Sequence, residues 1–150
     1  MNEAIGKFFA RLLPVLLRLV MGVVIGRYFF GVGRTDWQEL ALYVHAIIFL
    51  GCAGWAYQAD EHVRVDIFYR TASLKYKKMI NTFGTLFFLL PFLSVISFYS
   101  IDYIAASWKV SEISTESGGL TIVYIQKTLI LLFPLVLLFA SLSDLKKLWK

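Results

Sequence analysis

The chain has 150 residues, of which 59 % are hydrophobic and 17 % charged, and its formal net charge is +5. A soluble domain is typically roughly 45–50 % apolar and about 25 % charged, and so short a chain cannot bury this much apolar surface in water. The composition therefore excludes an ordinary soluble domain. The basic residues stand at the ends of apolar runs, which favours membrane flanks over a nucleic-acid partner. We expect one domain over residues 1–150, because the sequence shows no repeat or low-complexity linker.

The first long apolar run, at about residues 8–31, predicts a membrane-spanning helix, since about 20 residues cross a bilayer. No small-residue cleavage site follows it, so we expect it to be retained rather than removed as a signal peptide. Arg18 and Arg27 fall on opposite helical faces; they either reach the two membrane surfaces or are buried against partners. Gly22 and Gly26 form G-x-x-x-G, a pattern that permits close helix contact.

The second run, at about residues 36–57, predicts a second spanning helix. Glu39 stands near its start, and His45 lies in the middle of the span. A lone histidine there favours a hydrogen bond to a neighbouring helix over haem ligation, because the only other histidine lies outside the spans. Gly51 and Gly54 make the far end of this helix thin and predict tight packing.

An ion pair between Arg27 and Glu39 is predicted from their depth. Each lies four residues from the connecting turn, which is about 6 Å at the helical rise of 1.5 Å per residue. An antiparallel hairpin then brings them to one level, where a low dielectric constant favours pairing. The alternative is that each side chain reaches the surface separately.

The polar stretch at residues 58–78 is strongly basic and carries regularly spaced apolar residues. This pattern is typical of an amphipathic segment that lies along the membrane surface, here between the second and third helices. His62 and Asp66, four residues apart, meet on one helical face, with Arg64 between them. Local hydrogen bonding explains this pair better than a metal site, because further ligands are lacking in the sequence.

Two more spans are predicted at about residues 80–104 and 120–142, joined by a polar loop. Pro91 should kink the third span. Lys127 lies inside the fourth. Of the fifteen Lys and Arg residues, eleven fall on the side of the termini and the central stretch, and four on the other. The positive-inside rule then places both termini in the cytoplasm.

The sequence contains none of the familiar catalytic, nucleotide-binding or metal-binding motifs, so we expect neither an enzyme nor a cofactor. Two alternative classes remain, and the first of them also has four spans. A small multidrug exporter would need an acidic residue deep in its first span, where only arginines occur. The membrane anchor of a redox complex would need paired histidines in the membrane, and only His45 qualifies.

Several short motifs occur in an order that resembles a known family. They are R-Y-F-F at 27–30, W-x-E at 37–39, G-C-A-G-W-A at 51–56, E-H-V-R-V-D at 61–66, and W-K-V-S-E-I-S at 108–114 followed by G-G-L and Lys127. Over nearly its whole length the chain resembles the small, DctQ-like membrane subunit of tripartite ATP-independent periplasmic (TRAP) transporters.

The resemblance implies a bacterial inner-membrane complex in which a periplasmic binding protein captures an organic acid and a large membrane subunit carries the substrate and sodium sites. The small subunit packs beside the large one as a scaffold. The residues expected to pair within the membrane or with the large subunit are Arg18, Arg27, Glu39, His45 and Lys127. The residues expected to help dock the binding protein are Arg34, Lys109, Glu112 and Glu116; the alternative is that their loops are solvated connectors.

Overall fold

The structure is a computed structural model, and it describes residues 2–59 and 72–149. Within these ranges every regular element is a helix, and four stretches are long and apolar enough to cross a membrane: Glu3–Phe29, Thr35–Gln58, Leu74–Lys109 and Val123–Leu148. This confirms the prediction of an all-α membrane protein with four transmembrane helices. The segment predicted to lie along the membrane surface, with His62, Arg64 and Asp66, falls mainly outside the described residues.

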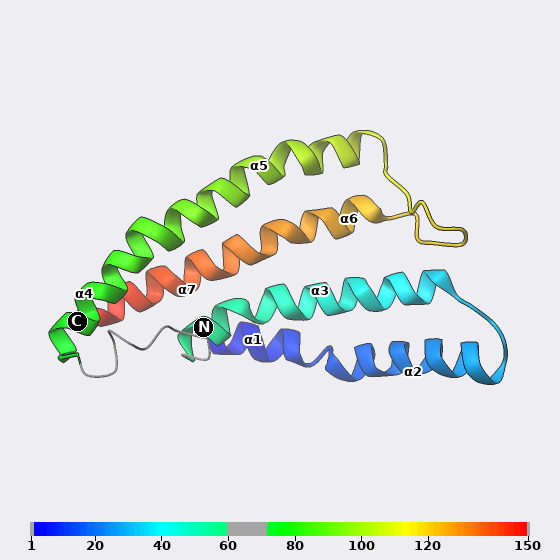
Figure 1. The fold of residues 1–150 in the computed structure, drawn as a ribbon, viewed down its shortest axis with the longest axis horizontal. Coiled ribbons are helices and arrows are strands. Elements are labelled where there is room, and N and C mark those ends of the chain that lie inside the picture. The colour runs from blue at the N-terminus through cyan, green and yellow to red at the C-terminus, as the bar shows by residue number, and fades with distance from the viewer. Residues whose placement is uncertain (1, 60–71, 150) are drawn as a thin grey trace.

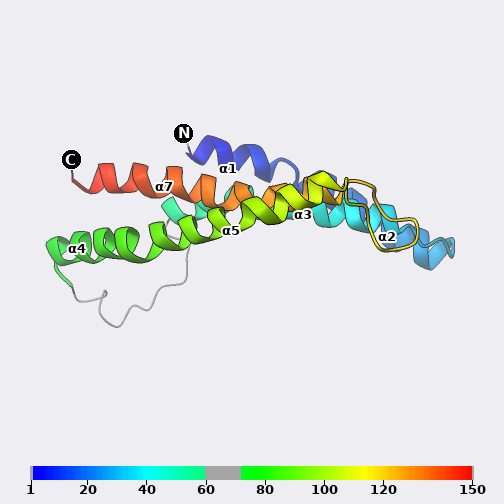
Figure 2. The ribbon, with the colours of Figure 1, turned by 90° about the horizontal axis from the view of Figure 1, so that it is seen from above.

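The elements follow one another as α1 (Asn2–Ala10), α2 (Leu13–Phe29), α3 (Thr35–Gln58), α4 (Leu74–Gly84), a π-helical turn (Thr85–Leu89), α5 (Leu90–Lys109), α6 (Val123–Thr128), a 3₁₀ turn (Leu129–Leu131) and α7 (Leu132–Leu148). Figure 1 shows them side by side as a row: α1 and α2, then α3, then α6 and α7, then α5. The second span therefore lies between the first and the fourth. Figure 2 gives the view from above.

Two small residues of α3 lie against its neighbouring helices. Gly54 faces the backbone of α7, where an added Cβ would lie 2.7 Å from the carbonyl oxygen of Val136. Gly51 faces α1, where a Cβ would overlap the ring of Phe9. Because small residues let helix backbones approach, these two glycines hold α3 between its neighbours.

The first span is two helices rather than the single one expected over residues 8–31. α1 ends at Ala10 and α2 begins at Leu13, with Pro14 in its first turn. A proline has no N–H to donate, and its ring collides with the carbonyl four residues earlier, which here belongs to Ala10. The break at Arg11 and Leu12 follows from this proline.

The third span also departs from its predicted bounds, because the helix runs for 36 residues from Leu74 to Lys109. At 1.5 Å per residue it is about 54 Å long, more than the roughly 30 Å of a bilayer core. The disturbance predicted at Pro91 takes the form of the π-helical turn just before it, where the amide of Leu90 donates to the carbonyl of Thr85. Figure 1 shows the ribbon from α4 to α5 bending along this stretch.

Candidate functional site

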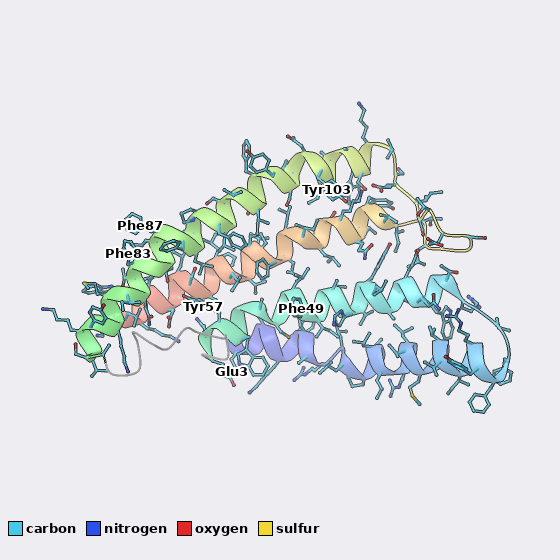
Figure 3. The ribbon with its side chains drawn as sticks, in the orientation of Figure 1. Glu3, Phe49, Tyr57, Phe83, Phe87 and Tyr103 are labelled. Carbon is cyan, nitrogen blue, oxygen red and sulfur yellow. The ribbon has the colours of Figure 1, made fainter. Side chains whose placement is uncertain are left out.

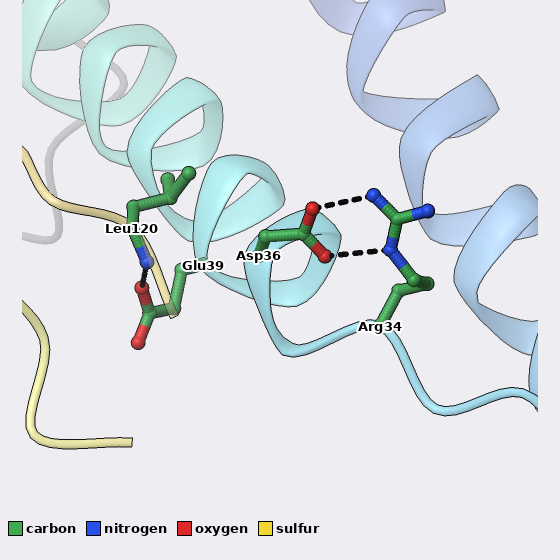
Figure 4. Close-up of polar contacts among 4 residues, drawn as sticks. All are labelled: Arg34, Asp36, Glu39 and Leu120. Atoms are coloured by element: carbon green, nitrogen blue, oxygen red, sulfur yellow. Dashed lines mark hydrogen bonds and ion pairs between the residues drawn. The ribbon is translucent and has the colours of Figure 1, made fainter. Parts of the chain in front are cut away.

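Two short connections, residues 30–34 and residues 110–122, lie at one end of the molecule (Figure 1), and we call them the short loop and the long loop. Several charged side chains of the spans and loops make contacts at this end. Glu39, in the second turn of α3, binds the long loop. One carboxylate oxygen accepts a hydrogen bond of 2.6 Å from the backbone N–H of Leu120 (Figure 4). The other accepts one from the hydroxyl of Ser114. Glu39 thus attaches the long loop to the central helix.

The long loop has internal hydrogen bonds of its own. The amide of Ser114 donates to the carbonyl of Leu120 over 2.9 Å, and the amide of Gly119 donates to the carbonyl of Glu116 over 3.0 Å. Gly118 has a φ of +73°, a conformation that favours glycine, and allows the tight turn between them. Together with Glu39, these bonds give the loop a defined shape.

Lys127 of α6 is neutralised by the same loop. Its ammonium group lies 2.5 Å from a carboxylate oxygen of Glu112 and 4.2 Å from the centre of the Tyr103 ring on α5. Figure 3 shows Tyr103 on the stretch of α5 that lies beside α6. The hydrogen bond from Lys127 lowers the pKa of the Glu112 carboxyl. The pair satisfies a lysine placed inside a spanning segment, where an unpaired charge is costly.

The short loop is held by a second ion pair. The guanidinium of Arg34 donates to both carboxylate oxygens of Asp36, over 2.9 and 2.6 Å (Figure 4). This two-point pairing raises the pKa of Arg34. Arg34 also lies 5.5 Å from the centre of the Trp37 ring, and the same ring covers Gly22 of α2.

The predicted Arg27–Glu39 ion pair is wrong. Gly22 packs at Trp37, so Arg27 lies nearer the turn than Glu39 does. Glu39 also lies on the side of α3 that faces the long loop, away from α2 (Figure 4). Counting residues from the turn gave the two side chains one depth, but it fixes neither the register of the hairpin nor the face on which a side chain lies. Arg18 and Arg27 are both exposed on α2, and within residues 2–59 and 72–149 neither forms an ion pair.

The remaining predicted residues are dispersed. His45 is exposed on α3 and stacks against Phe49, with ring centres 6.2 Å apart. Lys109 and Glu116 are exposed beside the long loop. Gly26 accepts a hydrogen bond from the amide of Val32 over 2.9 Å, so it closes the turn after α2. In the part of the chain that the structure describes, no three His, Cys, Asp or Glu side chains are grouped as a metal site would require.

The contacts of Glu39 with Ser114 and Leu120 were not anticipated from the sequence. These partners are 75 and 81 positions away from Glu39, and contacts between residues so far apart produce no periodic pattern in the sequence. The one available hint was that a carboxylate inside a predicted span must find donors, and the serine-rich and glycine-rich loop was a source of them.

These features define a multi-pass membrane protein whose intramembrane lysine and glutamate are satisfied by its own loop. The family model described as "Tripartite ATP-independent periplasmic transporters, DctQ component" matches residues 16–150. The chain belongs to this family, which confirms the resemblance seen in its motifs. Comparison with curated proteins and with solved structures found no match. The family is one of transporter subunits rather than enzymes, and its members are small permease subunits of TRAP transporters in the bacterial inner membrane.

Proposed function

We propose that this chain is a scaffold that carries no substrate and anchors the large membrane subunit during sodium-driven uptake of an organic acid delivered by a periplasmic binding protein. Its membership of the DctQ family supports this role. The observation that carries the proposal furthest is Arg18, an exposed charge in the middle of a spanning segment.

The depth of Arg18 follows from the contacts on either side of it. Phe9 packs at Gly51 and Gly22 packs at Trp37, so position 18 lies between these two contacts, at about the level of Ala41 in α3. A charged side chain at the centre of a membrane costs roughly 2.5–3.5 kcal/mol on insertion scales. α2 has no buried residue and Arg18 is exposed, so the residues that the structure describes do not cover it. An acidic or carbonyl-lined surface on the large subunit would remove that cost.

Copurification tests this contact. A tagged chain should bring the large subunit with it from membranes, and Arg18→Gln should reduce the recovered large subunit several-fold. Arg11→Gln, at the break between α1 and α2, is the matched control and should not. Full recovery with Arg18→Gln would show that Arg18 does not contact the large subunit.

We further propose that the end carrying the short and long loops faces the periplasm and helps dock the binding protein, with both termini in the cytoplasm. Arg34, Lys109, Glu112 and Glu116 lie at this end, and their mixed charges suit transient polar contact. Because Glu112 is occupied by Lys127, Glu116 and Lys109 are the better residues to test. Exchanging their charges (Glu116→Lys with Lys109→Glu) should slow uptake at low binding-protein concentration, and excess binding protein should restore it.

A further inference from the structure

A cavity of about 400 Å³ lies between α4–α5 and α7, at the end of the molecule opposite the two loops. Tyr57 of α3 lines it, and its hydroxyl lies 3.2 Å from that of Thr85 in the π-helical turn. Figure 3 shows Tyr57 near the end of α3, beside α7. The indole N–H of Trp149 donates to Thr82 over 3.2 Å and so joins the end of α7 to α4.

The lining changes character along the cavity. Its polar members lie nearer the outer end of the cavity, whereas Leu89, Phe92 and Phe133 come from further along the helices. The polar members are Tyr57, Asn81, Thr85 and Asp144. An apolar interior below a polar rim matches the order of groups in a phospholipid, whose acyl chains lie deeper in the membrane than its headgroup.

One acidic residue lines the cavity, and several lysines are exposed at the same end of the molecule. Asp144 lines the cavity itself. Lys75 and Lys78 on α4 and Lys146 and Lys147 on α7 are exposed at the same end of these helices. Lysines alone would attract any anionic lipid. A carboxylate in the lining disfavours a headgroup that is only negative and favours one that also carries a cation.

We propose that this cavity holds one molecule of a phospholipid with an ammonium headgroup, phosphatidylethanolamine. An acyl chain lies among Leu89, Phe92 and Phe133. The ammonium group pairs with Asp144, and the phosphate is attracted by the lysines of α4 and α7. The lipid fills the space between the third and fourth spans, where the helices alone leave a void without packing contacts.

Gly84 offers a direct way to block the cavity. It lines the cavity, and a Cβ built on it meets no atom within 4 Å. Gly84→Leu therefore places a side chain in the lipid's space without a collision inside the protein. Leu86→Trp is the matched control, because Leu86 lies two residues away in the adjoining π-helical turn, is 46 % exposed and does not line the cavity.

Native mass spectrometry of the full chain in detergent measures the binding. Lipid is first removed, and the chain is then titrated with phosphatidylethanolamine or phosphatidylglycerol of equal chain length. The wild type should retain one phosphatidylethanolamine in preference to phosphatidylglycerol. Gly84→Leu should lower this occupancy several-fold, and Leu86→Trp should leave it unchanged. Asp144→Asn should remove the preference between the two lipids.

Equal retention by Gly84→Leu and the wild type would overturn the proposal, as would the absence of any preference in the wild type. A photoactivatable phosphatidylethanolamine gives a second readout on the unaltered protein. It should label Leu89 or Phe92 through its acyl chain in the assembled transporter. If a cross-linker at Phe92→Cys instead captures the large subunit, the cavity is a protein interface and the proposal is wrong.

Discussion

Glu39 and Leu120 are 81 positions apart in the chain, yet the backbone N–H of Leu120 lies 2.6 Å from the carboxylate of Glu39. The contact joins the second span to the loop between the third and fourth. With the hydroxyl of Ser114 on its other oxygen, Glu39 has a donor for each oxygen. An acidic residue inside a span is thereby satisfied without a partner protein, and the long loop acquires a fixed position on α3.

Replacing Glu39 by alanine should release the long loop while leaving the helices in place. A donor left unsatisfied in a partly buried site costs about 1–3 kcal/mol, and here two donors lose their acceptor. Hydrogen exchange should show a faster rate at the amide of Leu120, with little change along α3 and α7. Glu116→Ala, in the exposed part of the same loop, is the control. Unchanged exchange at Leu120 would count against the contact.

The packing of α3 on α7 depends on the absence of a side chain at Gly54. A Cβ there would lie 2.7 Å from the backbone oxygen of Val136, which cannot move without moving α7. Gly54→Ala should lower the free energy of unfolding by about 1–3 kcal/mol through overpacking. Thermal unfolding in detergent measures this loss. Gly33→Ala, where a Cβ meets no atom within 4 Å, should unfold like the wild type. An equal loss of stability in both variants would show that overpacking against α7 is not the cause.

The Glu112–Lys127 ion pair should make stability depend on acid pH. The pKa of Glu112 is lowered below 4.5 in the folded chain, mainly by the hydrogen bond from Lys127. Because this pKa is lower in the folded state, the ion pair stabilises the fold fully at a pH above the pKa of the unfolded chain. That stabilisation is lost as the pH falls through the pKa of the folded chain. The difference in melting temperature between wild type and Glu112→Gln should therefore shrink below about pH 4.5. A difference that stays constant down to pH 3 would contradict the pair.

Orientation can be measured by cysteine labelling in a Cys52→Ser background. Glu116→Cys should react with an impermeant reagent added from the periplasm, and Lys75→Cys only after access to the cytoplasm. Both positions are exposed, whereas Ser114 is half-buried against Glu39 and would report on the loop contact as well. The reverse pattern of labelling would invert the proposed topology.

The four spans were predictable because their apolar length is set by the bilayer, whatever the helices pack against. The breaks within the spanning helices were harder to predict. Pro14 splits the first span at Arg11, although a proline near the start of a run is also compatible with one continuous helix. The choice of partners for Glu39 could not be predicted, since it depends on the order of the helices in the row. The number of residues from the turn suggested Arg27 of α2 as the partner. In the row of helices, α6 and the long loop lie on the side of α3 that faces away from α2.

Uptake by proteoliposomes tests the proposed scaffold role most directly. Liposomes containing this chain alone, the large subunit alone, or both are loaded with a sodium gradient and supplied with binding protein and its organic acid. We expect uptake only when both membrane subunits are present. Uptake by this chain alone, or full uptake by the large subunit without it, would show that this chain is not a required scaffold.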